Sequence, residues 1–300
     1  MSARDWALLL TLSVLWGGSF FFVKVALTDL PPLTIVLARV GIAAATLTVV
    51  IRVMGEALPR GAKAWLTLAV MALLNNLIPF SLIFSGQQAL PSGLAAILNA
   101  TTPLFTVVVM HLFTPDEKAT PPKVAGLVLG FAGVVVLLGP AIAGARDTPL
   151  WALLACLAAA LSYAFSGLWG RRIKPLGIAP TVTAWGQVTL TSAMMLPVVL
   201  MADRPWTLAS PGTATILALI GLGVLSTALA YVIFFRILDS AGPTNLMLVT
   251  FLIPVSAILL GSLVLGERLA WTHAAGMALI GLGLAAIDGR LWRRLFGRAA

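Results

Sequence analysis

Charged residues are scarce in this sequence. Asp, Glu, Lys and Arg make up 10% of the 300 residues, whereas apolar residues make up 60%. An ordinary soluble domain has about 25% charged residues, so this chain has too little polar surface for a soluble fold. The charges are also grouped, which leaves long runs without any of them. The composition therefore excludes an ordinary soluble domain and indicates an integral membrane protein.

Cysteine and the usual motifs of enzymes are also nearly missing. The single cysteine, Cys156, falls inside a predicted membrane helix and cannot form an intramolecular disulfide. The sequence has no His/Glu metal motif, no paired carboxylates, no Gly-x-Ser-x-Gly and no Asp-rich prenyl-phosphate site. We therefore expect no catalytic residues, no cofactor and no metal. A polytopic membrane enzyme, a pore and a lipid scramblase remain as alternative functions.

The uncharged runs have the length of membrane helices. About 20 apolar residues span a bilayer as a helix, and the run 64–115, too long for one span, contains a predicted turn at "GQQALPSG", residues 86–93. The runs are continuous and do not alternate, which favours helices over a β-barrel. The sequence thus predicts an all-α integral membrane protein. Its ten predicted helices cover about 6–27, 33–53, 64–85, 93–113, 122–142, 150–171, 180–201, 213–236, 242–265 and 270–288.

The basic residues predict how these helices are oriented. With the N-terminus in the cytoplasm, fourteen Lys and Arg residues fall on the cytoplasmic side, and only Arg146, Arg204 and Arg268 fall in outer loops. Basic residues favour cytoplasmic loops. We therefore expect a multi-pass protein of the cell (inner) membrane with both termini in the cytoplasm. The net charge of +9 follows from this topology, and we expect lipid, but no nucleic acid, as a partner.

The sequence contains an internal repeat. "LWGGSFFFVK" (15–24) aligns with part of "LSYAFSGLWGR" (161–171), and further matches follow in the same order with an offset of 147 to 151 residues. The matched pairs include Ser19 with Ser166, Lys24 with Arg171, Pro32 with Pro180, Arg39 with Gln187, Asn99 with Thr250, Pro103 with Pro254 and Glu117 with Glu267. The predicted units are residues 1–145 and 146–300, which form one compact transmembrane unit. Because each half has five helices, an odd number, the halves must face opposite ways, as in many secondary transporters.

The order of these features resembles the EamA-type drug/metabolite transporter superfamily over about residues 6–288. The resemblance rests on "LWGGSFFFVK", the arginine in "LARVGIAA", the central "TPLFT" of the fourth helix, a "GER" turn and a Gly-rich last helix in each half. The turn "TPDEK" departs from the Gly-Glu turn usual in the family's first half. Among the members, the sequence is similar to YddG-like amino-acid exporters.

This resemblance implies a fold and a function. Helices 1, 3, 4, 6, 8 and 9 would surround a central cavity, and helices 2 and 7 would move as gates. The expected function is export of small metabolites, neutral or aromatic/apolar amino acids in the first place, by alternating access between two inverted halves. Export of other small drugs or metabolites is the alternative. Whether the protein is a monomer or a homodimer is left open, and the glycines Gly126 and Gly130 could serve either internal helix packing or a dimer.

The predicted spans contain polar groups but no clear carboxylate. A cationic substrate would find no counter-charge there, whereas amides, hydroxyls and aromatic rings suit a neutral or zwitterionic solute. Each Ser, Thr or Asn could instead only bond a neighbouring helix. The residues predicted to bind substrate are Trp16, Ser19, Asn75, Asn76, Phe80, Asn99, Tyr163, Ser166, Thr227, Tyr231 and Thr250.

Two cations and two prolines stand inside predicted spans. Lys24 is predicted, like Arg39, to be a gating or charge residue, although it is close enough to the outer end of the first helix to extend to the headgroups instead. Arg39 is deeper, so it needs carbonyls, water or a substrate anion, and we expect either a structural role or a role in substrate binding or gating. Pro103 and Pro254 are predicted helix kinks that free carbonyls to face a cavity.

Overall fold

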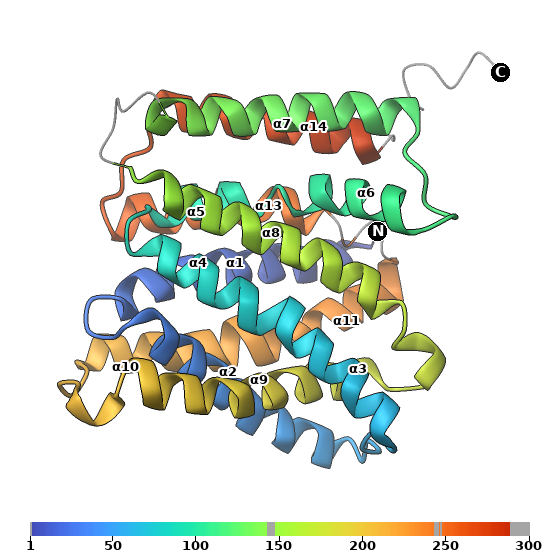
Figure 1. Cartoon of the computed structure of the whole chain (residues 1–300), viewed down its shortest axis with the longest axis vertical. Helices are drawn as coiled ribbons and strands as arrows, with labels where there is room; N and C mark the ends of the chain where they lie inside the picture. Colours follow the sequence, from blue (N-terminus) through green and yellow to red (C-terminus); the bar gives the residue numbers. More distant parts are fainter. Residues whose placement is uncertain (1, 143–147, 243–245, 247, 289–300) are drawn as a thin grey trace.

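The computed structural model describes residues 2–142, 148–242, 246 and 248–288. This part of the chain is helical throughout and contains no strand (Figure 1). In the first half the elements are α1 (Ala3–Ala26), α2 (Pro32–Val53), α3 (Ala62–Ala72), η1 (Leu73–Leu77), α4 (Ile78–Gln87), α5 (Ser92–Asn99), α6 (Thr102–Phe113) and α7 (Pro121–Ile142). In the second half they are α8 (Leu150–Gly170), η2 (Lys174–Leu176), α9 (Pro180–Ala202), η3 (Pro205–Thr207), α10 (Thr213–Ile220), η4 (Gly221–Leu229), α11 (Ala230–Ala241), α13 (Val249–Val264) and α14 (Trp271–Asp288).

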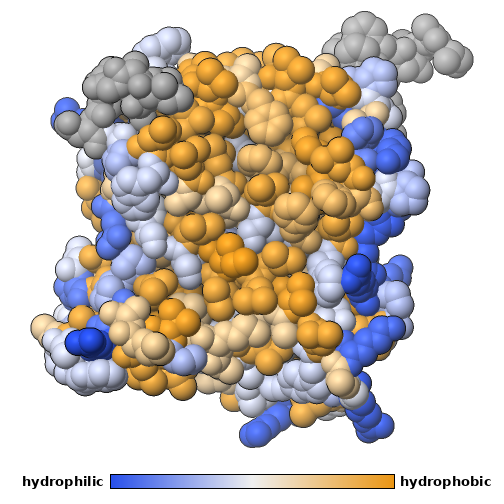
Figure 2. Space-filling view, viewed as in Figure 1, coloured by the Kyte–Doolittle hydropathy of each residue, from blue (hydrophilic) through white to orange (hydrophobic). Residues whose placement is uncertain are grey.

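These helices agree with a protein that crosses the membrane many times. Eight continuous helical stretches in the described residues are long and apolar enough to span a bilayer, and Leu252–Val264 and Trp271–Ile287 are shorter apolar helices. The predicted helix boundaries agree with the structure to within a few residues, except that the start of the predicted helix 242–265 falls partly outside the described residues. Figure 2 shows an apolar band that runs from top to bottom through the middle of this face, with hydrophilic residues along its left and right sides, as a bilayer requires.

The predicted helix 93–113 is two helices. α5 ends at Asn99 and α6 begins at Thr102, with Pro103 in its first turn. Proline has no N–H and its ring clashes with the carbonyl four residues earlier, so the Asn99 carbonyl instead accepts a bond from the Thr102 hydroxyl at 2.7 Å. Pro254, its match in the repeat, lies inside the continuous helix α13. The two prolines therefore have different structural effects.

Glycines bring α7 and α14 into close contact. A Cβ on Gly126 would lie 2.5 Å from the Gly283 carbonyl oxygen, and one on Gly133 would lie 2.7 Å from the Gly276 carbonyl oxygen. The contacts run in opposite order along the two helices, so the helices are antiparallel. The small-residue face at Gly126 therefore serves packing within the molecule.

Side-chain hydrogen bonds link α2 and α9 at both ends of this helix pair. Asp203, after α9, accepts bonds from the Thr34 N–H at 2.9 Å and the Thr34 hydroxyl at 2.7 Å, in the first turn of α2. Glu56, after α2, accepts a weaker bond of 3.4 Å from the Thr181 hydroxyl in the first turn of α9. Thr34 and Thr181 both lie in the first turns of helices that the repeat pairs, and Glu56 and Asp203 both follow the ends of those helices, although each is one residue away from the exact match. The two caps are therefore similar in place but not in exact register, whereas the glycine contacts of α7 and α14 are exchanged by the repeat.

Candidate functional site

Polar side chains from both halves meet in the interior. Asn75 is at their centre, and its Nδ2 donates to Gln187 Oε1 at 2.9 Å and to the Tyr231 hydroxyl at 3.3 Å. The Ser166 hydroxyl donates to Asn75 Oδ1 at 3.1 Å. The four side chains come from η1, α9, α11 and α8. Together with Arg39, Asn76 and Thr227 they form what we call the central cluster.

Arg39 brings a cation into this cluster. Its side chain is 6% exposed, and its Nε donates to the Thr227 hydroxyl at 2.9 Å. The guanidinium carbon lies 4.0 Å from the centre of the Phe80 ring and 5.7 Å from that of Phe84. Among the described residues, no carboxylate forms an ion pair with Arg39. The cation is therefore held by a hydroxyl and by aromatic faces, with no fixed counter-charge.

The two halves place the cluster residues on matching irregular segments. Asn75 and Asn76 lie in the π-helix η1, and Thr227 lies in the π-helix η4. Pro79 cannot donate to the carbonyl of Asn75, which favours a local change of helix register in the first half. In the second half, the Thr227 hydroxyl bonds the Leu222 carbonyl, five residues earlier, at 2.7 Å. π-Helical turns occur mostly at functional sites, and the sequence analysis did not predict them.

Several polar atoms here have no partner. Asn76 is fully buried, and although its Oδ1 accepts a bond of 3.4 Å from Tyr231, its Nδ2 donates to no acceptor in the described part of the chain. The buried Ser226 hydroxyl, next to Thr227 in η4, is likewise unpaired. Arg39 makes only its bond to Thr227 among the described residues. Because a buried unpaired polar group costs about 1–3 kcal/mol, these donors can bind a polar ligand.

The structure brings together most of the predicted site residues. Asn75, Asn76, Ser166, Thr227 and Tyr231 belong to the central cluster together with Arg39. Phe80 lies under the guanidinium, and Tyr163 is close enough to Arg39 to interact electrostatically.

Four predicted residues have no described contact with the central cluster. The Trp16 ring packs on Phe234 at 5.6 Å between centroids, and the Ser19 hydroxyl bonds the Trp16 carbonyl. Asn99 ends α5 with its Oδ1 buried and unpaired. Thr250 is half-buried in the first turn of α13.

Gln187 is the cluster member that the predicted set lacks. It is 3% exposed and accepts the bond from Asn75. Gln187 occupies the position equivalent to Arg39 in the internal repeat. This match could have predicted it as a site residue, since a polar group at one interior position makes the equivalent residue of the other half a candidate.

Lys24 contacts backbone carbonyls near the end of α1. Its ammonium group donates to the carbonyls of Gln87 and Leu90 at 2.9 and 3.0 Å, where α4 ends. Glu267 lies near enough to attract it and accepts bonds from the backbone and hydroxyl of Ser92 at 2.8 and 2.7 Å, in the first turn of α5. Helix-terminal carbonyls lack intrahelical partners, so they can outcompete water for the cation. We call Lys24, Glu267 and the helix ends that they bind the Lys24 latch.

The equivalent residues at the end of α8 are arranged differently. Arg171, the repeat partner of Lys24, forms a bidentate pair with Asp116, and its Nη1 lies 3.6 Å from Glu117, the repeat partner of Glu267. The hydrogen bonds from Arg171 hold the pKa of the Asp116 carboxyl below its ordinary value. The two sites therefore use the same residue types, but only the Lys24 site joins helix ends to each other.

Comparisons with known proteins agree with this architecture. The chain is 26% identical over 277 residues to the uncharacterized transporter YoaV of Bacillus subtilis, covering 92% of this chain and 94% of that protein. It is 30% identical over 286 residues to the uncharacterized transporter YvbV of the same organism, covering 92% and 89%. It is 28% identical over 306 residues to a probable amino-acid metabolite efflux pump of Escherichia coli, covering 98% of each.

A solved structure and a family model complete the comparison. The crystal structure of a protein with 22% sequence identity matches with a TM-score of 0.70, covering 99% of this chain and 100% of that chain, and this likeness shows the fold alone. The model of the EamA-like transporter family matches twice, at residues 6–139 and 150–287. The chain is thus a multi-pass membrane protein built from two repeats, and it belongs to the EamA-like transporter family.

Proposed function

We propose that this protein exports neutral or aromatic/apolar amino acids across the inner membrane by alternating access. In this proposal ten helices span the bilayer as two inverted halves, with both termini in the cytoplasm. The substrate binds at the central cluster, between the halves.

The observation that carries the proposal is Arg39, buried inside the molecule without an ion pair to any residue that the structure describes. A buried charge without a partner is costly, and cations within membrane spans usually pair with anions or face a water-filled path. A guanidinium matches a carboxylate in a bidentate geometry. The α-carboxylate of an amino acid supplies the missing anion, which gives Arg39 a role in binding substrate.

The rest of the cluster supports a zwitterionic substrate with an apolar side chain. The Asn76 amide is a second unpaired donor for the carboxylate. The Phe80 ring offers an apolar surface beside Arg39. The name of the E. coli relative, a probable amino-acid metabolite efflux pump, favours the same class of substrate.

The two latch sites support alternating access. Figure 1 shows α1 and α8 running in opposite directions, so their final residues lie at opposite ends of the molecule. The Lys24 latch joins α1, α4, α5 and the segment before α14, while Arg171 pairs with a surface loop. We infer that the Lys24 side is closed in this state and that the Arg171 side closes in the other. Inverted repeats can exchange such states by rocking around a fixed site.

The experiment that tests the proposal is transport in liposomes with a panel of labelled amino acids, their decarboxylated amines and unrelated drugs. We expect saturable transport of apolar amino acids and weak transport of the amines. Arg39→Gln should reduce the amino-acid signal, and protein-free liposomes provide the background. Transport of drugs but not amino acids would favour the broader exporter function, and flux that never saturates would indicate a pore.

A further inference from the structure

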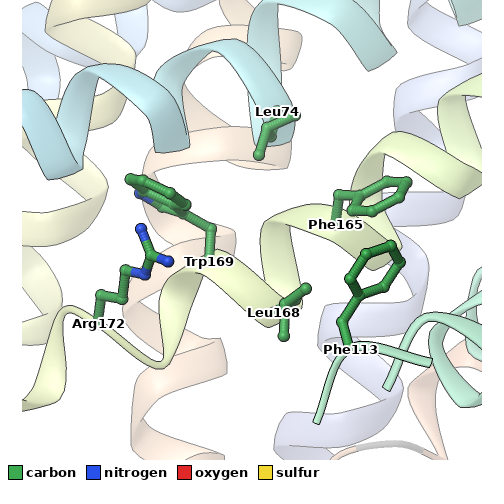
Figure 3. Close-up of a pocket in the computed structure, with 6 residues that line it drawn as sticks. All are labelled: Leu74, Phe113, Phe165, Leu168, Trp169 and Arg172. Carbon is green, nitrogen blue, oxygen red and sulfur yellow. The ribbon is translucent and has the colours of Figure 1, made fainter. Parts of the chain in front are cut away.

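A pocket of about 320 Å³ lies beside α8, away from the central cluster. Leu74, Phe113, Phe165, Leu168, Trp169 and Arg172 line it (Figure 3). These residues come from η1, the end of α6 and the last turns of α8. Its volume is in the range of small-molecule sites. Neither the central cluster nor the latch sites share a residue with it.

The pocket is on the lipid-facing side of α8. Its residues Phe165, Leu168 and Arg172 continue, at helical spacing, a stripe of exposed residues that includes Leu154 (49% exposed) and Leu161 (36% exposed). The inward side of the same helix is marked by Ser162 and Ser166, whose hydroxyls bond Leu74 and Asn75 of η1. Since residues three and four apart share a helix face, the pocket opens away from the protein interior and into the apolar band.

A cation stands at the edge of this apolar pocket. The Arg172 guanidinium carbon lies 3.9 Å from the centre of the Trp169 ring, and the indole N–H fixes that ring by donating to the Thr67 carbonyl at 3.1 Å. Arg171 next to it is paired with Asp116, but Arg172 has no carboxylate partner among the described residues. α8 ends at Gly170, so Arg172 lies just beyond the helix, where a membrane has its headgroups.

The walls of the pocket are apolar. Phe113, the last residue of α6, is 61% exposed and meets Phe165 edge-on, with ring centroids 5.8 Å apart. Leu74 and Leu168 complete the apolar lining. A molecule that fits has a strong anion at one end and a flexible hydrocarbon chain at the other.

We propose that this pocket binds one anionic phospholipid of the adjoining leaflet, with its phosphate on Arg172 and an acyl chain between Leu74 and the Phe113–Phe165 pair. Arginine binds phosphate through two parallel hydrogen bonds, and basic pockets between membrane helices bind anionic headgroups. Because the site borders η1, which carries Asn75 and Asn76, a bound lipid would also brace the segment that positions the central cluster.

The test uses lipids with brominated acyl chains, which quench tryptophan fluorescence on contact. The full chain is reconstituted in phosphatidylcholine with increasing brominated phosphatidylglycerol or brominated phosphatidylcholine. The signal of Trp169 is the difference between the wild type and Trp169→Phe. We expect brominated phosphatidylglycerol to quench Trp169 at about fivefold lower mole fraction than brominated phosphatidylcholine. Unlabelled phosphatidylglycerol should reverse the quenching.

Two variants decide the assignment. Arg172→Gln should abolish the preference for the anionic lipid, whereas Arg171→Gln, whose guanidinium is already paired, should keep it. Equal quenching by both lipids, or a preference that survives Arg172→Gln, would overturn the proposal. So would displacement by inorganic phosphate, which would indicate a small-anion site, or by a transported amino acid, which would indicate a lateral substrate entry. Leu168→Trp, which fills the pocket from an exposed helix face, should block the quenching without loss of folding.

Discussion

At the scale of single residues, the buried guanidinium of Arg39 carries the strongest constraint on function. Hydroxyl and aromatic partners, Thr227 and Phe80, hold its position, but they do not neutralise it. Gln187 at the equivalent position of the other half indicates that the architecture itself requires only a polar group there. The charge is therefore explained better by a ligand than by folding.

Replacing Arg39 with glutamine should lower the transport of amino acids by about 10- to 100-fold, because hydrogen bonds to charged groups contribute about 1.5–3 kcal/mol. Competition by the corresponding decarboxylated amine should change much less, so the preference for a carboxylate should shrink. Counterflow in liposomes measures both. Lys174→Gln, an exposed lysine beyond α8, is the matched control. Equal losses for the amino acid and the amine would show that Arg39 only positions its neighbours.

A second prediction at the residue scale compares polar residues inside the protein with an exposed tryptophan. Asn99→Ala and Tyr231→Ala should each lower transport several-fold while the protein still folds and inserts, because each removes a polar group inside the protein, at about 1 kcal/mol or more. Trp271→Ala, at a residue that is 79% exposed, should leave the order of preferred substrates unchanged. Normal transport of the whole panel by both interior variants would mean that these residues only pack.

The sequence predicts much of the central cluster, and its misses have identifiable causes. Asn75, Asn76 and Tyr231 could be predicted because polar groups inside apolar runs must face protein or a cavity. The contacts of Lys24 could not be predicted, since they depend on where α4 ends relative to α1. Gln187 was missed although the repeat matched it with Arg39, because the absence of a charge at that position indicated only that the fold does not require the Arg39 charge.

At the scale of elements, the irregular segments matter more than the regular helices. The sequence places all the long helices, because apolar length alone defines them. The π-helices η1 and η4 change which face each following residue presents, and no hydropathy pattern records such a shift. The break at Ala100 and Thr101 was expected only as a kink at Pro103, since hydropathy does not distinguish one bent helix from two short ones.

The glycine contacts between α7 and α14 give an element-scale prediction. Gly283→Ala should destabilise the protein by about 1–3 kcal/mol, the usual cost of overpacking, because its Cβ would lie 2.5 Å from the Gly126 carbonyl oxygen. Gly281→Ala on the same helix has open space around its Cβ and should be neutral or slightly stabilising, since alanine favours helices. Thermal unfolding in detergent, followed by size-exclusion fluorescence, measures the difference. Equal melting temperatures for the two variants would contradict the close contact.

At the scale of the whole molecule, the repeat explains why the contacts come in pairs. The contacts between the α7 and α14 glycines are exchanged by the repeat, α2 and α9 carry similar caps one residue out of register, and the sequence predicted that the chain has two such halves. The latch sites are the exception, because Lys24 and Arg171 occupy equivalent positions but have different partners. In the proposed alternating access this difference belongs to one conformation and not to the fold, so a sequence repeat does not predict it.

The latch difference predicts opposite effects of two equivalent substitutions. Lys24→Met removes the charge-assisted bonds to the Gln87 and Leu90 carbonyls, so the population open on this side should rise about tenfold or more. Arg171→Met removes an exposed pair, which contributes at most about 1 kcal/mol to the present state. It should disfavour the alternative state, in which Arg171 would bind helix ends as Lys24 does here.

The readout is alkylation of Ala95→Cys, a fully buried position on α5, in a Cys156→Ala background. An impermeant maleimide should label this cysteine faster in Lys24→Met than in the parent, because labelling requires the Lys24 side to open. In Arg171→Met it should react at the parent rate or more slowly. If both substitutions accelerate labelling, they loosen the protein locally and the two sites do not alternate. Opposite shifts are expected only if the sites compete, because a substitution changes an equilibrium by its unequal effect on the two states.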